Sequence, residues 1–135
     1  MIEPAEVHLD TQVLVWLYVD PRRSWPAPAR QLLNSGRLRH APMARMELRY
    51  LHEIGRIKVT PEVLLGELYA KLGLAESDLP CGRVVDMAER LDWTRDPFDR
   101  LIVAQAMAAD AALITADRLI RERFPGAVWA TADHS

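Results

Sequence analysis

The chain contains a single cysteine, Cys81, so it can form neither an internal disulfide framework nor a CxxC metal or redox motif. Lysine is almost as scarce, because Lys58 and Lys71 are the only two among 17 basic residues. No uncharged run approaches the length that spans a bilayer, and the N-terminus carries Glu3 and Glu6 instead of a basic signal region. These absences predict a cytoplasmic protein without a membrane segment.

Two common ligand-binding motifs are missing as well. The four histidines, His8, His40, His52 and His134, are scattered without ligand spacing, so no zinc site is implied. No glycine-rich loop ends in Lys-Ser/Thr, which argues against a nucleotide-binding switch.

Length and composition fit one compact domain that spans residues 1–135, half of which are hydrophobic. The formal charge of -2 gives no basic footprint and counts mildly against a nucleic-acid ligand. Apart from the two lysines, however, the basic residues are all arginines, which suit bidentate phosphate contacts.

Hydrophobic periodicity and capping signals predict strands that alternate with helices. The predicted strands are 7–10, 38–41, 111–115 and 127–130, with a short extended segment at 57–59. The predicted helices are 11–19, 27–34, 42–54, 60–73, 83–91, 118–124 and one that opens at Asp96. Such alternation predicts an α/β fold, with a central parallel sheet of about four to five short strands and helices on both faces.

Aspartates stand where this fold would place a ligand. Asp10 and Asp117 follow predicted strands, and Asp96 and Asp99 lie three residues apart in the first turn of a predicted helix. Because ligands of parallel sheets bind beyond the carboxyl ends of the strands, these acids are expected to converge on one edge. Taken singly, each has a structural explanation: Asp10, Asp96 and Asp117 as helix caps, and Asp99 through the helix dipole.

Glu47 is harder to explain structurally, because it falls within the apolar face of the helix predicted for 42–54. That face is formed by Met43, Ala44, Met46, Tyr50, Leu51 and Ile54. A carboxylate aimed at a core is costly unless a partner charge compensates it. A buried ion pair with Arg100 is one explanation, and a divalent ion shared with the aspartates is the other.

A shared ion would be Mg²⁺ or Mn²⁺, which prefer carboxylate oxygens and phosphate. Such an ion can hold a phosphodiester oxygen and lower the pKa of a bound water, so the acids favour phosphodiester hydrolysis. Without the five acids, 14 acidic residues remain against 17 basic ones, which makes a polyanionic substrate more acceptable.

In this order, these residues resemble the PIN-domain ribonucleases, and within them the VapC-type toxins of bacterial toxin–antitoxin pairs. The likeness covers nearly the whole chain. Its motifs are Leu9-Asp10-Thr11 with Leu14-Val15-Trp16-Leu17, Met46-Glu47-Leu48 with Gly55-Arg56-Ile57, Asp96-Pro97-Phe98-Asp99-Arg100-Leu101-Ile102-Val103-Ala104-Gln105-Ala106, and Leu113-Ile114-Thr115-Ala116-Asp117.

The resemblance implies a PIN-like fold and Mg²⁺- or Mn²⁺-dependent endoribonuclease activity. It implies that Asp10, Glu47, Asp99 and Asp117 are the catalytic, metal-binding quartet, with an outer shell of Asp96, Thr115 and Thr11. The implied partners are RNA, a cognate antitoxin and a second copy of the chain in a homodimer. Arg100, Arg95 and Arg45 are candidate contacts to RNA phosphates, although a solvated surface role is the commoner explanation for any one of them.

Two other functions stay open at this point. A receiver-like phosphotransfer domain also gathers acids around Mg²⁺, but it needs a lysine after a late strand, and neither Lys58 nor Lys71 is placed there. A catalytically silent PIN-like domain could act only as a binding or regulatory module. The intact set of Asp10, Glu47, Asp99 and Asp117 argues against the silent form.

Overall fold

Five parallel strands form the central sheet of the computed structural model, which describes residues 3–131. The strands are β1 (Glu6–Leu9), β2 (Arg37–His40), β3 (Ala75–Glu76), β4 (Ala112–Ile114) and β5 (Ala127–Val128). Their order across the sheet is β3-β2-β1-β4-β5, so β1 is central. Val7 of β1 pairs with Leu38 on one side and with Ala112 on the other.

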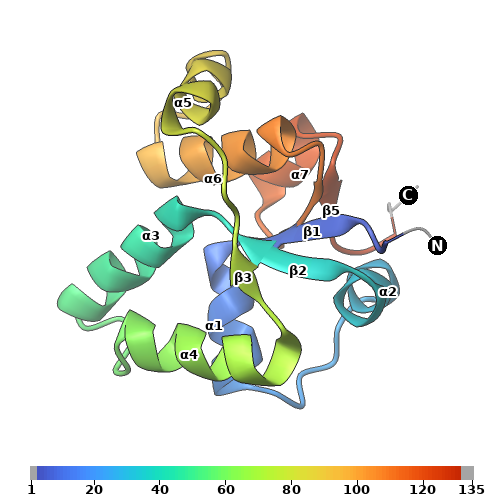
Figure 1. Ribbon diagram of the computed structural model, residues 1–135, viewed down its shortest axis with the longest axis vertical. Helices are drawn as coiled ribbons and strands as arrows, with labels where there is room; N and C mark the ends of the chain where they lie inside the picture. The colour runs from blue at the N-terminus through green and yellow to red at the C-terminus, as the bar shows by residue number, and fades with distance from the viewer. Residues whose placement is uncertain (1–2, 132–135) are drawn as a thin grey trace.

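Seven helices of the described residues flank this sheet. They are α1 (Thr11–Val19), α2 (Ala27–Ser35), α3 (Pro42–Glu53), α4 (Pro61–Leu72), α5 (Cys81–Glu89), α6 (Pro97–Ala108) and α7 (Arg118–Arg123). Figure 1 shows α1 to α4 on one side of the strands and α5 to α7 on the other. The strands β2 and β3 are added on one side of β1, and β4 and β5 on the other, so the strand order switches between β1 and β4. Such a switch point is where open α/β sheets place their ligands.

The core is formed by aliphatic side chains from β1, β4 and the helices that cover them. Leu9, Leu14, Leu48 and Leu113 are fully buried. Helix α6 is buried almost all round over residues 102–106, because it lies against the sheet and also contacts α3 and α5. This position explains the long apolar block of its sequence, since a helix covered on several sides needs no polar face.

The predicted fold class is confirmed, and the helices lie close to their predicted bounds. Two short segments differ. Residues 57–59, predicted to be extended, form bends and pair with no strand, whereas β3, which the sequence analysis missed, is only two residues long. Strands of that length carry no alternating pattern that a sequence could reveal. His134 lies outside the described residues.

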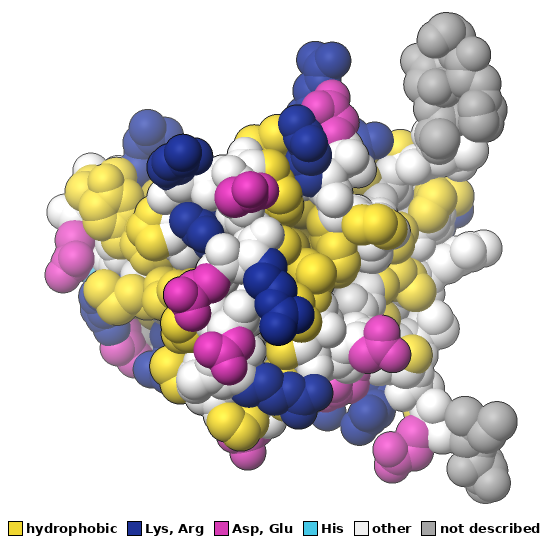
Figure 2. Space-filling view, turned by 90° about the horizontal axis from the view of Figure 1, so that it is seen from above, with side chains coloured by type: hydrophobic (Ala, Val, Ile, Leu, Met, Phe, Trp, Pro, Cys, Tyr) yellow, Lys and Arg dark blue, Asp and Glu magenta, His cyan; other side chains and the backbone are white. Residues whose placement is uncertain are grey.

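Charges of both signs cover the outer surface around α5. Figure 2 shows basic and acidic side chains interspersed on this face, separated by strips of apolar atoms. This face therefore has no continuous basic surface of the kind that nucleic-acid-binding domains present. Among residues 3–131, no helix is long and apolar enough to cross a membrane.

Candidate active site

Asp10 lies at the carboxyl end of the central strand, where β1 passes into α1. Its side chain is only 7% exposed. Oδ1 accepts a hydrogen bond of 2.8 Å from the backbone N–H of Thr11, and Oδ2 accepts one of 2.6 Å from the hydroxyl of Thr115. Asp10 is thus the N-cap residue of α1, but only Oδ1 accepts the capping hydrogen bond.

Asp117 comes from the neighbouring strand and lies beside Asp10. It follows β4 and caps α7, because its Oδ1 accepts a hydrogen bond of 3.0 Å from the backbone N–H of Ile120. Its own backbone N–H donates to the Thr115 hydroxyl at 3.0 Å. The fully buried Thr115 therefore fixes both aspartates relative to one another.

Helix α6 supplies the third aspartate, and its two acids have different roles. Asp96 is the cap, since its Oδ1 accepts hydrogen bonds from the backbone N–H groups of Phe98 (2.9 Å) and Asp99 (3.4 Å). Pro97 occupies the first helical position, where its missing N–H costs nothing. This leaves the Asp99 side chain free of capping, and it faces the same cavity as Asp10.

Glu47 reaches that cavity from α3, although the apolar face predicted around it is partly wrong. Ala44 and Leu48 are fully buried, but Met46, Tyr50 and Ile54 are 50%, 46% and 49% exposed. The neighbouring elements cover a face of α3 that includes Ala44 and Leu48, and Glu47 lies at the border of this face. Its carboxylate is therefore half-buried beside the aspartates instead of within the core.

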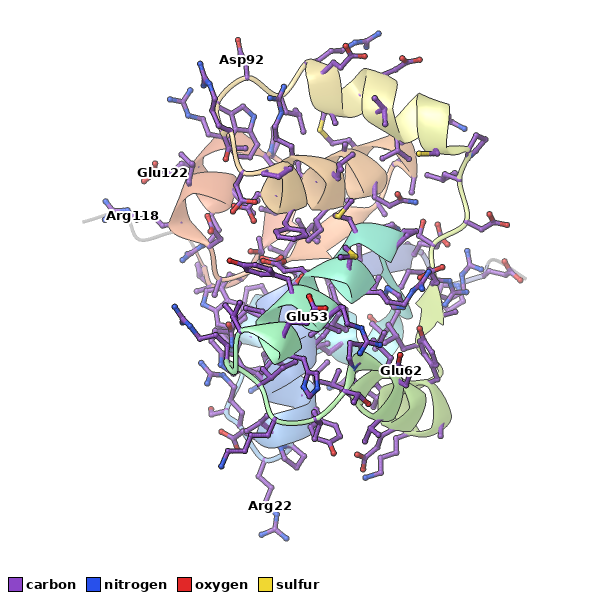
Figure 3. The ribbon with its side chains drawn as sticks, turned by 90° about the vertical axis from the view of Figure 1, so that its left-hand side faces the viewer. Arg22, Glu53, Glu62, Asp92, Arg118 and Glu122 are labelled. Carbon is purple, nitrogen blue, oxygen red and sulfur yellow. The ribbon has the colours of Figure 1, made fainter. Side chains whose placement is uncertain are left out.

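The four acids line one cavity of about 360 Å³ at the carboxyl edge of the sheet. Figure 3 looks onto α3, with α6 above it. The complete lining of this cavity, which we call the acidic cavity, is Asp10, Thr11, Gln12, Glu47, Leu51, Asp99, Ala116 and Asp117. No basic side chain belongs to it.

Burial, together with the crowding of like charges, makes three of these carboxylates hard to ionise. Burial, followed by the charges of Asp96, Asp10, Asp117 and Glu47, raises the pKa of Asp99 to about 7. Burial also raises the pKa of Asp10, against the hydrogen bonds from Thr115 and Thr11. The pKa of Glu47 is raised for the same main reason.

A divalent cation fits this donor set. Mg²⁺ and Mn²⁺ prefer carboxylate oxygens as ligands. The carboxylates of the acidic cavity repel one another, and no basic side chain lines the cavity to compensate their charge. The hydroxyl oxygen of Thr11 is also buried in the cavity wall without a hydrogen-bond partner. Within residues 3–131, no three acidic or histidine side chains already converge as a finished ligand set. The role of the quartet as metal ligands therefore stays a prediction.

The proposed pairing of Glu47 with Arg100 is wrong. The Arg100 guanidinium donates to the backbone carbonyls of Ala88 at 3.1 and 3.3 Å and of Glu89 at 3.4 Å. Carbonyls at the end of a helix have no partner within it, so α5 offers Arg100 a strong alternative. In the described part of the chain, no ion pair involves Glu47.

The same contacts bear on the arginines expected at RNA phosphates. Arg100 is held by α5, and Arg45 donates to both carboxylate oxygens of Glu76, at 2.7 and 3.3 Å. Arg95 is exposed next to Asp96 at the start of α6 and has no ion pair among the described residues. Of the three, Arg95 is the one that neither a carboxylate nor a backbone carbonyl of the described residues holds.

Three lining residues were missed by the sequence analysis: Gln12, Leu51 and Ala116. Two of them could have been found. Gln12 lies in the first turn of α1 directly after Asp10 and Thr11, and Ala116 separates Thr115 from Asp117. Leu51 is one helical turn beyond Glu47, so it shares the side of α3 that carries the carboxylate.

The fold agrees with comparisons to known proteins. The PIN domain family matches residues 7–123, and the chain belongs to this family. The resemblance found in the sequence is therefore confirmed. A curated relative is "Ribonuclease VapC22" of Mycobacterium tuberculosis (strain ATCC 25618 / H37Rv). It is 30% identical over 131 residues, which cover 91% of this chain and 98% of that protein.

Solved structures share the fold at lower identity. A chain in the crystal structure of VapBC2 from Rickettsia felis, bound to a DNA fragment from their promoter, matches with a TM-score of 0.66 and 18% identity over 95% of this chain and 99% of that one. VapBC-1 from nontypeable Haemophilus influenzae matches with a TM-score of 0.62 and 15% identity, over 92% and 96%. At these identities the likeness concerns the fold alone.

Proposed function

We propose that this protein is a metal-dependent endoribonuclease that acts as the toxin of a type II toxin–antitoxin pair. The observation that carries the proposal is the meeting of Asp10, Glu47, Asp99 and Asp117 in one cavity that no basic side chain lines. Membership of the PIN family and 30% identity to a protein named a ribonuclease support it. The substrate would be cytoplasmic RNA.

In this proposal Asp10, Glu47, Asp99 and Asp117 would hold Mg²⁺ or Mn²⁺ in the acidic cavity. The bound ion would supply a Lewis acid for the phosphodiester and a water of lowered pKa. Asp10 would be the fixed ligand, because Thr115 and Thr11 already orient both of its oxygens. Asp96 and Thr115 would act from the outer shell by positioning α6 and the two strand-end aspartates.

The lysine distribution argues against a receiver-like domain. Lys58 lies in the loop between α3 and α4, and Lys71 lies in the last turn of α4, where it pairs with Glu67. Neither residue lines the acidic cavity. A phosphotransfer site would lack the cation that such a domain places beside its aspartates.

An antitoxin and a second copy of the chain are the proposed protein partners. The structural neighbours are VapBC assemblies, which supports the antitoxin. The exposed apolar side chains of Met46 and Tyr50 on α3 and of Ile54 at its C-cap recur every four residues and form a ridge. Exposed apolar surface of this kind is typical of protein interfaces.

The test incubates the purified protein with tRNA and with an mRNA transcript in Mn²⁺, in Mg²⁺ or in chelator. Asp10→Asn and Asp99→Asn are compared with Asp92→Asn, whose side chain points away from the molecule far from α3 (Figure 3). We expect internal cleavage only with metal, unchanged in the control and reduced by more than about 100-fold in the two site variants. Cleavage in chelator, or full activity of both site variants, would reject the metal-dependent mechanism, and absence of cleavage under every condition would leave a silent binding domain.

A further inference from the structure

We infer that the groove between α1 and the loop after α3 holds the RNA strand on one side of the scissile phosphate, with Arg56 and Lys58 contacting its backbone. The inference rests on the proposed nuclease function. It adds a subsite with two named basic residues to the acidic cavity. We call this groove the α1 groove.

The α1 groove encloses about 440 Å³, within the range of ~300–1,000 Å³ that is usual for ligand sites. One wall is the face of α1 formed by Gln12, Val15, Trp16 and Val19, with Tyr18 beside it. The opposite wall is the loop from Arg56 to Val59, and Leu64 of α4 forms part of the floor. Val19 is 66% exposed, an unusual fraction for an aliphatic side chain in a groove.

Continuity with the acidic cavity is the first reason to place RNA here. Gln12 lines both spaces, so the groove begins where the cluster of carboxylates ends. An endonuclease cuts within a strand, so nucleotides must leave the scissile phosphate in both directions. The α1 groove offers one of these two paths.

The loop is anchored to the wall of the acidic cavity. The backbone N–H groups of Arg56 and Ile57 both donate to the carbonyl of Leu51, at 2.8 and 3.3 Å. Leu51 itself lines the acidic cavity. Gly55 makes the tight return possible, because its φ of +80° is strained for any other residue. The backbone of the loop that carries Arg56 and Lys58 is therefore held against a residue of the cavity wall.

Charge is the second reason, and the neighbouring groove between α3 and α4 provides the contrast. That groove is of similar size, about 460 Å³, but its two arginines are neutralised, Arg45 by Glu76 and Arg49 by Glu62. Arg56 and Lys58 are exposed and take part in no ion pair within the described residues. Free cations beside an apolar wall with aromatic members are typical of single-strand binding sites, where phosphates meet charge and bases meet the wall.

The experiment compares the double variant Arg56→Gln/Lys58→Gln with the charge-matched control Arg30→Gln/Arg90→Gln. The control arginines are exposed on α2 and at the end of α5, do not line the groove, and form no ion pair in the part of the chain described. Initial rates are measured on the RNA that the wild type cleaves fastest, with Mn²⁺ and over a range of salt concentrations.

We expect the groove variant to raise KM about tenfold with kcat nearly unchanged, because phosphate contacts position a strand without doing chemistry. The slope of log(kcat/KM) against log[salt] should become shallower by about 1.4, since each lost contact to single-stranded RNA removes about 0.7. The control should keep the wild-type KM and slope. A groove variant that matches the control would overturn the inference while the nuclease function stands.

Two further measurements separate the remaining outcomes. Binding of labelled mixed-sequence RNA by the Asp99→Asn protein, with and without the groove substitutions, tests the subsite even if no RNA is cleaved. Weaker binding by the groove variant supports the subsite, and equal binding overturns it. Loss of binding to the cognate antitoxin with RNA kinetics unchanged would assign the groove to a protein partner and also overturn the inference.

Discussion

The hydroxyl of Thr115 donates a hydrogen bond of 2.6 Å to Oδ2 of Asp10 and so joins the carboxyl ends of the adjacent strands β4 and β1. The same hydroxyl oxygen accepts a hydrogen bond from the backbone N–H of Asp117. One buried side chain therefore sets the spacing of two carboxylates that come from positions 107 residues apart in the chain. In the proposed nuclease, Thr115 is a positioning residue.

Thr115→Val should lower kcat/KM by roughly 10–100-fold, the usual loss when an outer-shell partner of a metal ligand is removed. Valine keeps the shape but leaves Asp10 Oδ2 and the Asp117 N–H without their partner. Because the Thr115 hydrogen bond lowers the pKa of Asp10, its loss should also shift the pH–rate profile to higher pH. Thr115→Ser should restore both the rate and the profile. A valine variant with the wild-type profile would show that this bond has no part in the reaction.

Mn²⁺ or Mg²⁺ should raise the melting temperature of the wild type, because a ligand that binds only the folded state stabilises it by about 2.7 kcal/mol at 100 times Kd. Glu47→Gln should reduce this shift, since it removes one charge from the acidic cavity. Asp92→Asn, a matched loss of an exposed carboxylate, should keep the full shift. The measurement is a thermal melt with metal and with chelator. Equal shifts in all three proteins would place metal binding outside the cavity.

The sequence revealed the acidic residues of the site, but it did not show which of them only cap a helix and which also line the acidic cavity. Asp10, Asp96 and Asp117 all carry the signature of a helix cap, and all three do accept hydrogen bonds from helix N–H groups. What separates Asp96 is position, because it does not line the acidic cavity whereas the other two do. A carboxylate has two oxygens, so one that caps a helix can still offer the other to a metal ion, and a cap signal in the sequence could not exclude that second role.

The side-chain contacts of charged residues were the feature of the structure that the sequence predicted least well. Arg100 follows Asp99 directly, and its sequence position gave no sign that its guanidinium would reach the end of α5. The apolar pattern of α3 likewise predicted burial of Met46, which is half exposed. Both outcomes depend on which elements pack beside the helix, and that is decided by the tertiary fold.

Asp99→Asn should stabilise the metal-free protein at pH 8 while it removes activity. The pKa of Asp99 is about 7 in the folded state against an ordinary value of 3.8, so the folded protein favours the protonated form. That stabilisation is complete below about pH 4 and is lost as the pH rises through 7. Asparagine is neutral at every pH. Because the carboxyl is partly exposed and its neighbours are screened by solvent, we expect a gain of only about 1 kcal/mol in the free energy of unfolding at pH 8.

The measurement for Asp99→Asn is urea unfolding in chelator at pH 5 and pH 8, with Asp92→Asn as the control. The difference from the wild type should be small at pH 5, where most Asp99 carboxyls are already protonated in the folded protein. It should grow toward pH 8. A variant that is less stable than the wild type at pH 8 would mean that the Asp99 carboxylate is already stabilised within the protein, against the crowding of charge in the acidic cavity.

His8 should make the protein lose stability as the pH falls below 6.5. Its side chain in β1 is 1% exposed, and neither ring nitrogen has a hydrogen-bond partner within residues 3–131. Burial, helped by the charges of His40 and Arg39, lowers the pKa of His8 to about 4. Between pH 6.5 and 4 the unfolded chain takes up a proton that folded His8 does not. The free energy of unfolding should therefore fall with pH, by up to about 3 kcal/mol from this residue.

His8→Leu removes the titrating group and fills nearly the same volume with an apolar side chain, so the decline between pH 6.5 and 4 should become shallower. Part of the decline should remain in the variant because of His40, whose pKa is also lowered by burial. The control is Val7→Ala, which truncates a buried apolar side chain of the same strand, removes no titrating group and should keep the wild-type slope. The check is the free energy of unfolding in urea at several pH values in this window. If His8→Leu followed the wild-type slope, His8 would have to be protonated in the folded protein, and a buried partner for its charge would be required.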